Sequence, residues 1–169
     1  MVEIDFYISH FCITQTVKVV MSYFSGEYEC KIDAKGRMVL PAKIKAKLPE
    51  IHTSELVVKR GFEPCLVLYP QIEWKKVFSK VAGLSEFNKE YRNFQRNFLR
   101  GATEIDMDAN GRILLPKTMT RFAEIEKEVI VVGTGNRIEI WNPDKYNEFL
   151  INDEDEFSLL AEKFLSGDE

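Results

Sequence analysis

The sequence predicts an α+β domain with an internal pseudo-twofold repeat. The first observation is an eleven-residue segment, residues 33–43, which recurs 75 positions later as residues 108–118 with Asp, Ala, Gly, Arg, Leu and Pro in the same order. The second is that each copy is followed by two short apolar runs around a turn and then by a proline that opens a helical pattern. A twofold repeat of this kind usually folds as one pseudo-symmetric domain.

Each repeat is expected to open with a tight β-hairpin. In the first copy, residues 28–32 and 38–40 are predicted to be short strands, and the four residues between them supply the turn. The turn glycine adopts a positive φ without steric cost, and the turn aspartate can bond to backbone N–H groups across the bend. The expected loop-bracing residues of the two copies are Asp33, Gly36, Asp108 and Gly111.

A short helix and a second hairpin are expected next. Pro41 and Pro116 suit the first turn of a helix, where the missing N–H costs nothing. The apolar runs at residues 56–58 and 65–69 then predict a hairpin, and the glycine-containing turn at residues 133–136 predicts its counterpart.

Longer helices are expected to complete the pattern. They should begin at Pro70 and Pro143, the second with Asn142 as its N-cap. A linker helix is predicted over residues 85–100, and apolar residues at helical spacing extend into an acidic tail.

The predicted organisation has four parts. Residues 1–20 form an N-terminal extension, either disordered or the product of a mis-assigned start, since Met21 lies where a natural start is expected. Residues 21–99 hold the first repeat with the linker helix, residues 100–150 the second repeat, and residues 151–169 the acidic helical tail.

Charge is distributed unevenly along the chain. The formal net charge is −4, but the two ends hold 9 of the 27 acidic residues and only 2 of the 23 basic ones, so the middle is net positive. Residues 31–47 contain six basic residues against Asp33 alone. Such a cluster is typical of a phosphate-binding surface, although a solvated lysine-rich face gives the same pattern.

Several functional classes are disfavoured. The three cysteines are odd in number and lack short paired spacing, which argues against a disulfide framework and a zinc site. The sequence contains no run of eighteen apolar residues, so it predicts no membrane-spanning helix. The two histidines have no matched nucleophile or carboxylate pair nearby in sequence. We therefore expect a cytoplasmic protein that is not an enzyme, with no cofactor, no metal and no small-molecule substrate.

The two Asp-x-x-x-Arg motifs, each followed by an apolar triplet and a proline, resemble those of the MraZ family of bacterial transcriptional regulators, which are tandem AbrB-like proteins. The resemblance runs from about residue 21 to about residue 150. It implies a swapped-hairpin β-barrel with peripheral helices, and assembly of the chains into a homo-oligomeric ring. It also implies that the loops bind double-stranded DNA at direct repeats in the promoter of the division and cell wall gene cluster, in a nucleoid-associated protein.

By this resemblance Arg37 and Arg112 match the motif arginines, and an arginine at the tip of a two-stranded ribbon can reach guanine in the major groove. Lys35 is basic where its counterpart Asn110 is neutral, and the second copy lacks the lysine-rich helix, so Arg112 is expected to contribute less. The expected DNA-binding residues are Arg37, Lys35, Arg112, Lys31 and Lys43.

Two alternatives stay open. Each arginine can be purely structural, held by its own aspartate beside the turn. The whole protein can also be an antitoxin-like or scaffold ring whose partner is another protein.

Overall fold

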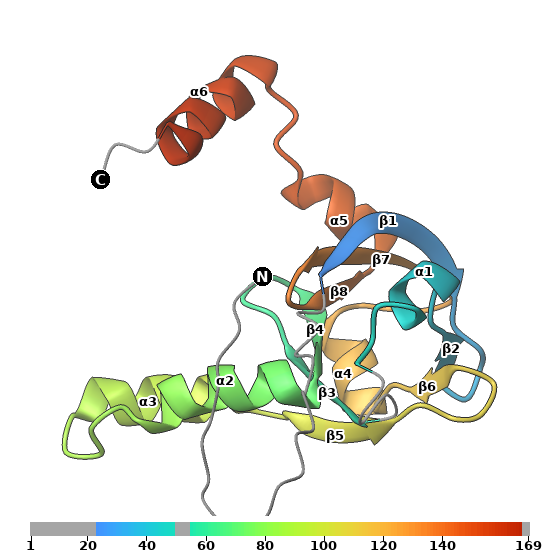
Figure 1. Cartoon of the computed structure of the whole chain (residues 1–169), viewed down its shortest axis with the longest axis horizontal. Coiled ribbons are helices and arrows are strands. Elements are labelled where there is room, and N and C mark those ends of the chain that lie inside the picture. Colours follow the sequence, from blue (N-terminus) through green and yellow to red (C-terminus); the bar gives the residue numbers. More distant parts are fainter. Residues whose placement is uncertain (1–22, 50–54, 167–169) are drawn as a thin grey trace, which may run out of the picture.

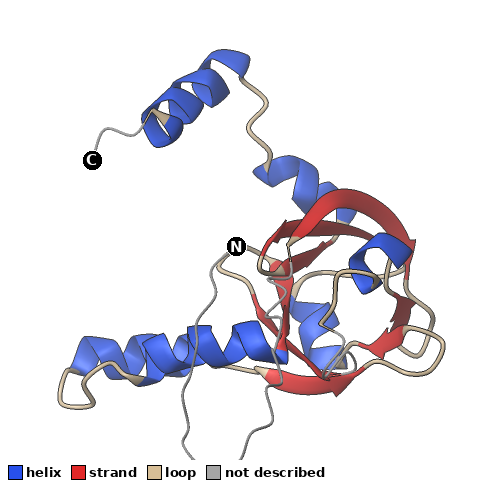
Figure 2. Cartoon of the chain, viewed as in Figure 1, coloured by secondary structure: helices blue, strands red, loops and turns tan. Residues whose placement is uncertain are grey.

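The computed structural model describes residues 23–49 and 55–166. The predicted extension, residues 1–20, lies outside the described residues. The fold is mixed α/β, with an antiparallel sheet and helices around it (Figures 1 and 2). The strands are β1 (Phe24–Lys31), β2 (Arg37–Val39), β3 (Glu55–Arg60), β4 (Cys65–Pro70), β5 (Thr103–Asp106), β6 (Arg112–Leu114), β7 (Glu128–Gly135) and β8 (Ile138–Trp141). The helices are α1 (Ala42–Lys45), α2 (Gln71–Ala82), α3 (Lys89–Phe98), α4 (Lys117–Phe122), α5 (Pro143–Phe149) and α6 (Glu154–Leu165).

The strands of the two repeats interleave. The larger sheet has the order β1-β7-β8-β4-β3-β5, and β2 and β6 form a separate two-stranded ribbon. Exchanging each strand for its counterpart in the other repeat reverses this order and leaves the sheet unchanged. The register shows the same symmetry. At one edge of the sheet Lys31 is opposite Glu128, and at the other edge the equivalent residues of the two repeats, Asp106 and Glu55, are opposite each other. The two repeats are therefore related by a pseudo-twofold axis, which passes between β4 and β8.

The predicted first hairpin is wrong in its pairing. β1 pairs with β7 and β2 pairs with β6, so the two strands that flank the first turn meet only at a bridge between Ile32 and Met38. Turn chemistry determines a local reversal of the chain but not the partner of a three-residue strand. The second hairpins, β3 with β4 and β7 with β8, are confirmed. The larger sheet does not close on itself, since β1 and β5 are its edges.

Helix ends follow the local sequence closely. Asn142 caps α5 as predicted, with its side chain accepting bonds from the N–H groups of Asp144 and Lys145. Pro41 and Pro116 stand directly before α1 and α4 rather than inside their first turns. The linker helix begins at Lys89, later than predicted, because the Asn88 side chain caps it there.

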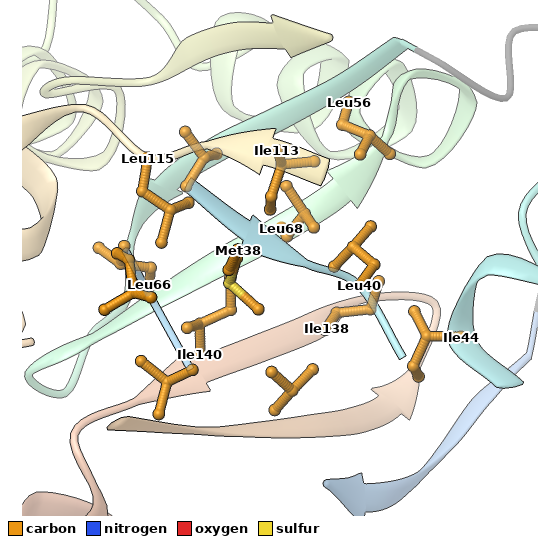
Figure 3. Close-up of a cluster of buried hydrophobic side chains, with 14 of the residues drawn as sticks. Met38, Leu40, Ile44, Leu56, Leu66, Leu68, Ile113, Leu115, Ile138 and Ile140 are labelled. Atoms are coloured by element: carbon orange, nitrogen blue, oxygen red, sulfur yellow. The ribbon is translucent and has the colours of Figure 1, made fainter. Parts of the chain in front are cut away.

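The central strands β3 and β4 of the larger sheet are buried on both faces, so strand alternation divides the core into two parts. Leu56, Val58, Leu66 and Leu68 point to one side, where they meet the ribbon and the helices α1 and α4 (Figure 3). The intervening residues Val57, Cys65, Val67 and Tyr69 point to the other side, where they meet Trp74 of α2 and Trp141. In the described part of the chain, no helix has the length and apolarity that crossing a bilayer requires.

Candidate nucleic-acid interface

The two Asp-x-x-x-Arg loops have the same geometry. In the first, Asp33 Oδ1 accepts hydrogen bonds of 2.9 Å from the N–H groups of Lys35 and Arg37, and the Asp33 carbonyl accepts from the Gly36 N–H at 2.9 Å. In the second loop, Asp108 Oδ1 accepts from the N–H groups of Asn110 and Arg112, and the Asp108 carbonyl accepts from the Gly111 N–H, each at 2.9 Å. One carboxylate in each loop therefore closes the turn.

The other carboxylate oxygen holds the arginine. Asp33 Oδ2 accepts from Arg37 Nε at 2.8 Å, and Asp108 Oδ2 accepts from Arg112 Nε at 2.7 Å. The contact uses Nε alone, so among the described residues neither terminal nitrogen of either guanidinium has a protein partner. The arginine side chains are 37% and 36% exposed. Each guanidinium is thus oriented by its aspartate while its two terminal nitrogens remain available to a ligand.

Both aspartates are stabilised in their charged form. The pKa of Asp33 is lowered first by the backbone N–H of Arg37, and the pKa of Asp108 is lowered first by that of Arg112, with the arginine side chains adding to each shift. Because the folded-state pKa is lowered, the stability that each charged aspartate contributes is fully present above the ordinary aspartate pKa of about 3.9. That contribution is lost as pH falls through the lowered value.

We expect Asp33→Asn/Asp108→Asn protein to fold but to release both arginines. An amide can still accept the two backbone bonds, but its nitrogen cannot accept from Arg Nε. Thermal unfolding against pH checks this: the difference in melting temperature between wild type and variant should shrink as pH falls from about 3.9 through the lowered folded-state pKa, where the wild-type carboxyls lose their charge. A difference that stays constant down to pH 2 would contradict the role of the charge.

The lysine-rich helix α1, which follows the first loop in sequence, lies beside the second loop. A Cβ added at Gly111 would lie 2.5 Å from Nζ and 2.8 Å from Cδ of Lys45, which shows that the Lys45 side chain crosses over that glycine. The backbone agrees, because the N–H of Leu40, just before α1, donates to the Gly111 carbonyl at 3.1 Å. In the sequence this basic helix belongs to the first copy, but because β2 and β6 pair across the repeats it lies beside the loop of the second.

The ribbon joins the two loops into one surface. Arg37 is opposite Leu114 and Val39 is opposite Arg112, while Met38 and Ile113 pair between them. Since alternate residues share a face, the two arginines lie diagonally on one face with Val39 and Leu114. Those two aliphatic side chains are 51% and 54% exposed, whereas Met38 and Ile113 are 1% exposed. We call this face, made of Arg37, Val39, Arg112 and Leu114, the ribbon face.

Val39 and Leu114 were absent from the residues expected to bind DNA. Their signal in the sequence was the alternation that places positions 37 and 39 on the same side of a strand. That signal has no meaning until the partner strand is known, since an isolated three-residue strand has no defined outer face.

The remaining expected residues lie in the first loop, at the end of β1 and on α1. Lys35 is exposed in the first loop, and Lys43 is exposed on α1. Lys31 is exposed at the end of β1, directly opposite Glu128, which offsets its charge. Lys47 turns toward Ser25, with Nζ donating to Oγ at 3.1 Å. The basic run therefore divides, and only part of it reaches the loops.

Across residues 23–49 and 55–166, no group of three or more His, Cys, Asp or Glu side chains is arranged to hold a metal ion. The pKa of Cys65 is raised to about 12 by burial, which leaves this thiol protonated at neutral pH.

Comparison with known proteins gives consistent matches. The family model described as "MraZ protein, putative antitoxin-like" matches twice in tandem, over residues 23–97 and 98–165. The protein named Transcriptional regulator MraZ of Cytophaga hutchinsonii is 59% identical over 146 residues, covering 86% of this chain and 97% of that protein. The protein of the same name from Christiangramia forsetii is 41% identical over 145 residues, covering 85% of this chain and 94% of that protein.

Proposed function

The chain belongs to the MraZ family, and from this premise we propose that it is a sequence-specific DNA-binding transcriptional regulator. Its target is the set of direct repeats in the promoter of the division and cell wall gene cluster. It acts in the cytoplasm, on the nucleoid, as a homo-oligomeric ring. The interleaved strands are in keeping with a swapped-hairpin barrel of the AbrB-like kind.

The observation that carries this proposal is the pair of half-exposed guanidinium groups, each fixed through Nε with both terminal nitrogens free of protein partners among the described residues. Two terminal nitrogens in a fixed plane match the O6 and N7 acceptors of guanine in the major groove. A two-stranded ribbon is narrow enough to enter that groove. The bracing aspartates reduce the entropy that each arginine loses on binding.

The aliphatic members of the ribbon face fit the same groove. Val39 and Leu114 are exposed between the arginines, where apolar side chains can contact the C5-methyl group of thymine. Lys35 beside the first loop and Lys45 beside the second supply one ammonium group for each, which suits phosphate on either side of the groove. Both loops are therefore equipped to bind, although Glu104 and Asp106 precede the second.

Arginine substitution tests the proposal. We expect Arg37→Ala to weaken binding to the promoter repeats by roughly 10- to 100-fold, the value of one bidentate guanine contact. Arg112→Ala should lower affinity to a similar or smaller extent. Affinity is measured by fluorescence anisotropy on a labelled repeat, with circular dichroism and native mass recorded for each variant.

Arg137→Ala is the matched control. Arg137 is also half exposed and also ion-paired through Nε, to Glu139 at 3.5 Å, but it lies in the turn between β7 and β8. Its loss should leave DNA affinity unchanged. If folded and assembled Arg37→Ala and Arg112→Ala proteins bind as wild type does, the arginines are structural only and the proposed role of the ribbon face is wrong.

A protein-binding scaffold is the second candidate. It is favoured by the exposed aromatic side chains away from the ribbon face, among them Phe62 at 78% and Phe87 at 90% exposed. A stoichiometric protein partner retained by wild-type protein that shows no retention on promoter DNA would favour this function.

A further inference from the structure

Helix α6 carries an apolar stripe that is largely exposed in the described part of the chain. Phe157, Leu160, Ala161, Phe164 and Leu165 follow the i, i+3, i+4, i+7, i+8 spacing of one helix face. Phe157, Phe164 and Leu165 are 60%, 70% and 83% exposed, and α6 has no buried residue. A twelve-residue helix with a bare apolar face is marginal in water, so its stripe needs a partner surface.

A second unpartnered surface lies on the helical hairpin of α2 and α3. The hairpin is firmly built: the rings of Trp74 and Phe98 stack with centroids 6.4 Å apart, and the Gln95 side chain donates to the Val81 carbonyl at 2.9 Å. Yet Phe78, Tyr91 and Phe94 remain 43%, 42% and 41% exposed. We call these three side chains the hairpin patch.

A cavity lies at the root of the hairpin, beside this patch. Its volume is about 360 Å³. Val57, Trp74, Phe78, Leu99 and Ala102 form its aromatic and aliphatic side, and Thr103 and Glu104 form its polar edge. The aromatic and aliphatic side of this cavity can accept an aromatic side chain from another helix. The phenylalanines of α6 are exposed aromatic groups of suitable shape, on a helix with no buried residue.

The charges of the two surfaces are complementary. Residues 153–165 hold five acidic residues and one basic residue, a net charge of −4. Residues 71–100 hold seven basic and three acidic residues, a net charge of +4. Opposite fields of this size steer two surfaces together and favour one pairing over others.

We propose that α6 of one protomer docks on the α2–α3 hairpin of a neighbouring protomer, with its phenylalanines against the hairpin patch and the adjoining cavity. Figure 1 shows α6 standing apart from the sheet and from its own α2–α3 hairpin. The two surfaces differ, so the contact is head-to-tail. Such a contact closes a ring when its rotation divides a full turn evenly, and otherwise builds an open filament. This inference rests on the ring assembly of the proposed function and identifies the surfaces that build it.

Native mass, measured by light scattering without DNA, tests whether assembly requires the apolar stripe of α6. Phe157→Asp/Phe164→Asp protein should fall to the mass of one protomer with an unchanged far-ultraviolet spectrum outside the α6 contribution. Leu159→Asp is the matched control, because Leu159 is 66% exposed on the opposite side of α6. The control should keep the wild-type assembly.

Complementation between two variants tests whether the α2–α3 hairpin is the surface that receives α6. Tyr91→Asp/Arg96→Glu protein keeps α6 but has a damaged hairpin, and it too should be a monomer. Mixing it with the Phe157→Asp/Phe164→Asp protein leaves one intact α6 and one intact hairpin, so a one-to-one dimer should form and no larger species. A wild-type monomer, an α6 variant of wild-type mass, or a mixture without dimer would each overturn the proposal.

DNA binding is read separately, which keeps the two proposals distinguishable. The Phe157→Asp/Phe164→Asp monomer retains both loops, so its affinity for one isolated repeat should match that of wild-type protein. Loss of assembly with retained single-site binding supports the docking proposal, whereas failure of the ribbon face leaves native mass unaffected.

Discussion

A DNA fragment that carries several promoter repeats is expected to bind wild-type protein at least roughly 100-fold more tightly than a fragment with one repeat. One ribbon face presents only two arginines and two aliphatic side chains, which is too little for tight binding alone. A ring holds several such faces at a fixed spacing, so the first contact raises the effective concentration of the next. Anisotropy titrations on fragments with one, two and four repeats measure the gain.

The α6 variant supplies the control for this gain. Phe157→Asp/Phe164→Asp protein should bind the array no more tightly per site than the single repeat, while Leu159→Asp protein should retain the full advantage. The slope of log affinity against log salt should also be steeper for the array in wild-type protein, because more phosphate contacts release more counterions. Equal wild-type affinity for one repeat and for four would rule out a multivalent mechanism.

Local chemistry in the sequence predicted most of the turns and helix starts. The second hairpins follow from apolar runs around glycine, and the cap of α5 follows from one asparagine, because each depends on residues close together in the sequence. The recurrence of the Asp-x-x-x-Arg motif predicted the pseudo-twofold axis. Interactions between residues close in sequence can be predicted from short sequence patterns without a structure.

The strand partners were not predictable in the same way. β2 has three residues, and nothing in Arg37-Met38-Val39 distinguishes pairing with β1 from pairing with β6. The choice depends on burying Met38 against Ile113, 75 positions away. Two functional features follow only from that choice: the ribbon face with its aliphatic pair, and Lys45 beside the second loop.

Gly133→Ala is expected to produce the largest loss of stability of any single methyl group added in the described strands. Gly133 lies in β7 opposite Gly26 of β1, and a Cβ there would collide with the Ser25 backbone nitrogen and lie 2.6 Å from the Phe24 carbonyl carbon. Both are backbone atoms of the paired strand, so no side-chain rotation relieves the overlap. The adjoining Phe24 side chain is fully buried, so the strand cannot retreat without opening the core.

We expect a cost of about 3 kcal/mol, the upper end of typical overpacking, and a fall in melting temperature of roughly 6–12 °C for a chain of this size. Gly135→Ala is the matched control in the same strand. Gly135 has φ +78° with open space around its Cβ position, so alanine there pays only the left-handed backbone strain of about 1 kcal/mol. Chemical denaturation of both variants at equal protein concentration separates the two causes. If Gly135→Ala is the more damaging change, backbone conformation rather than the close approach of β1 to β7 limits this edge of the sheet.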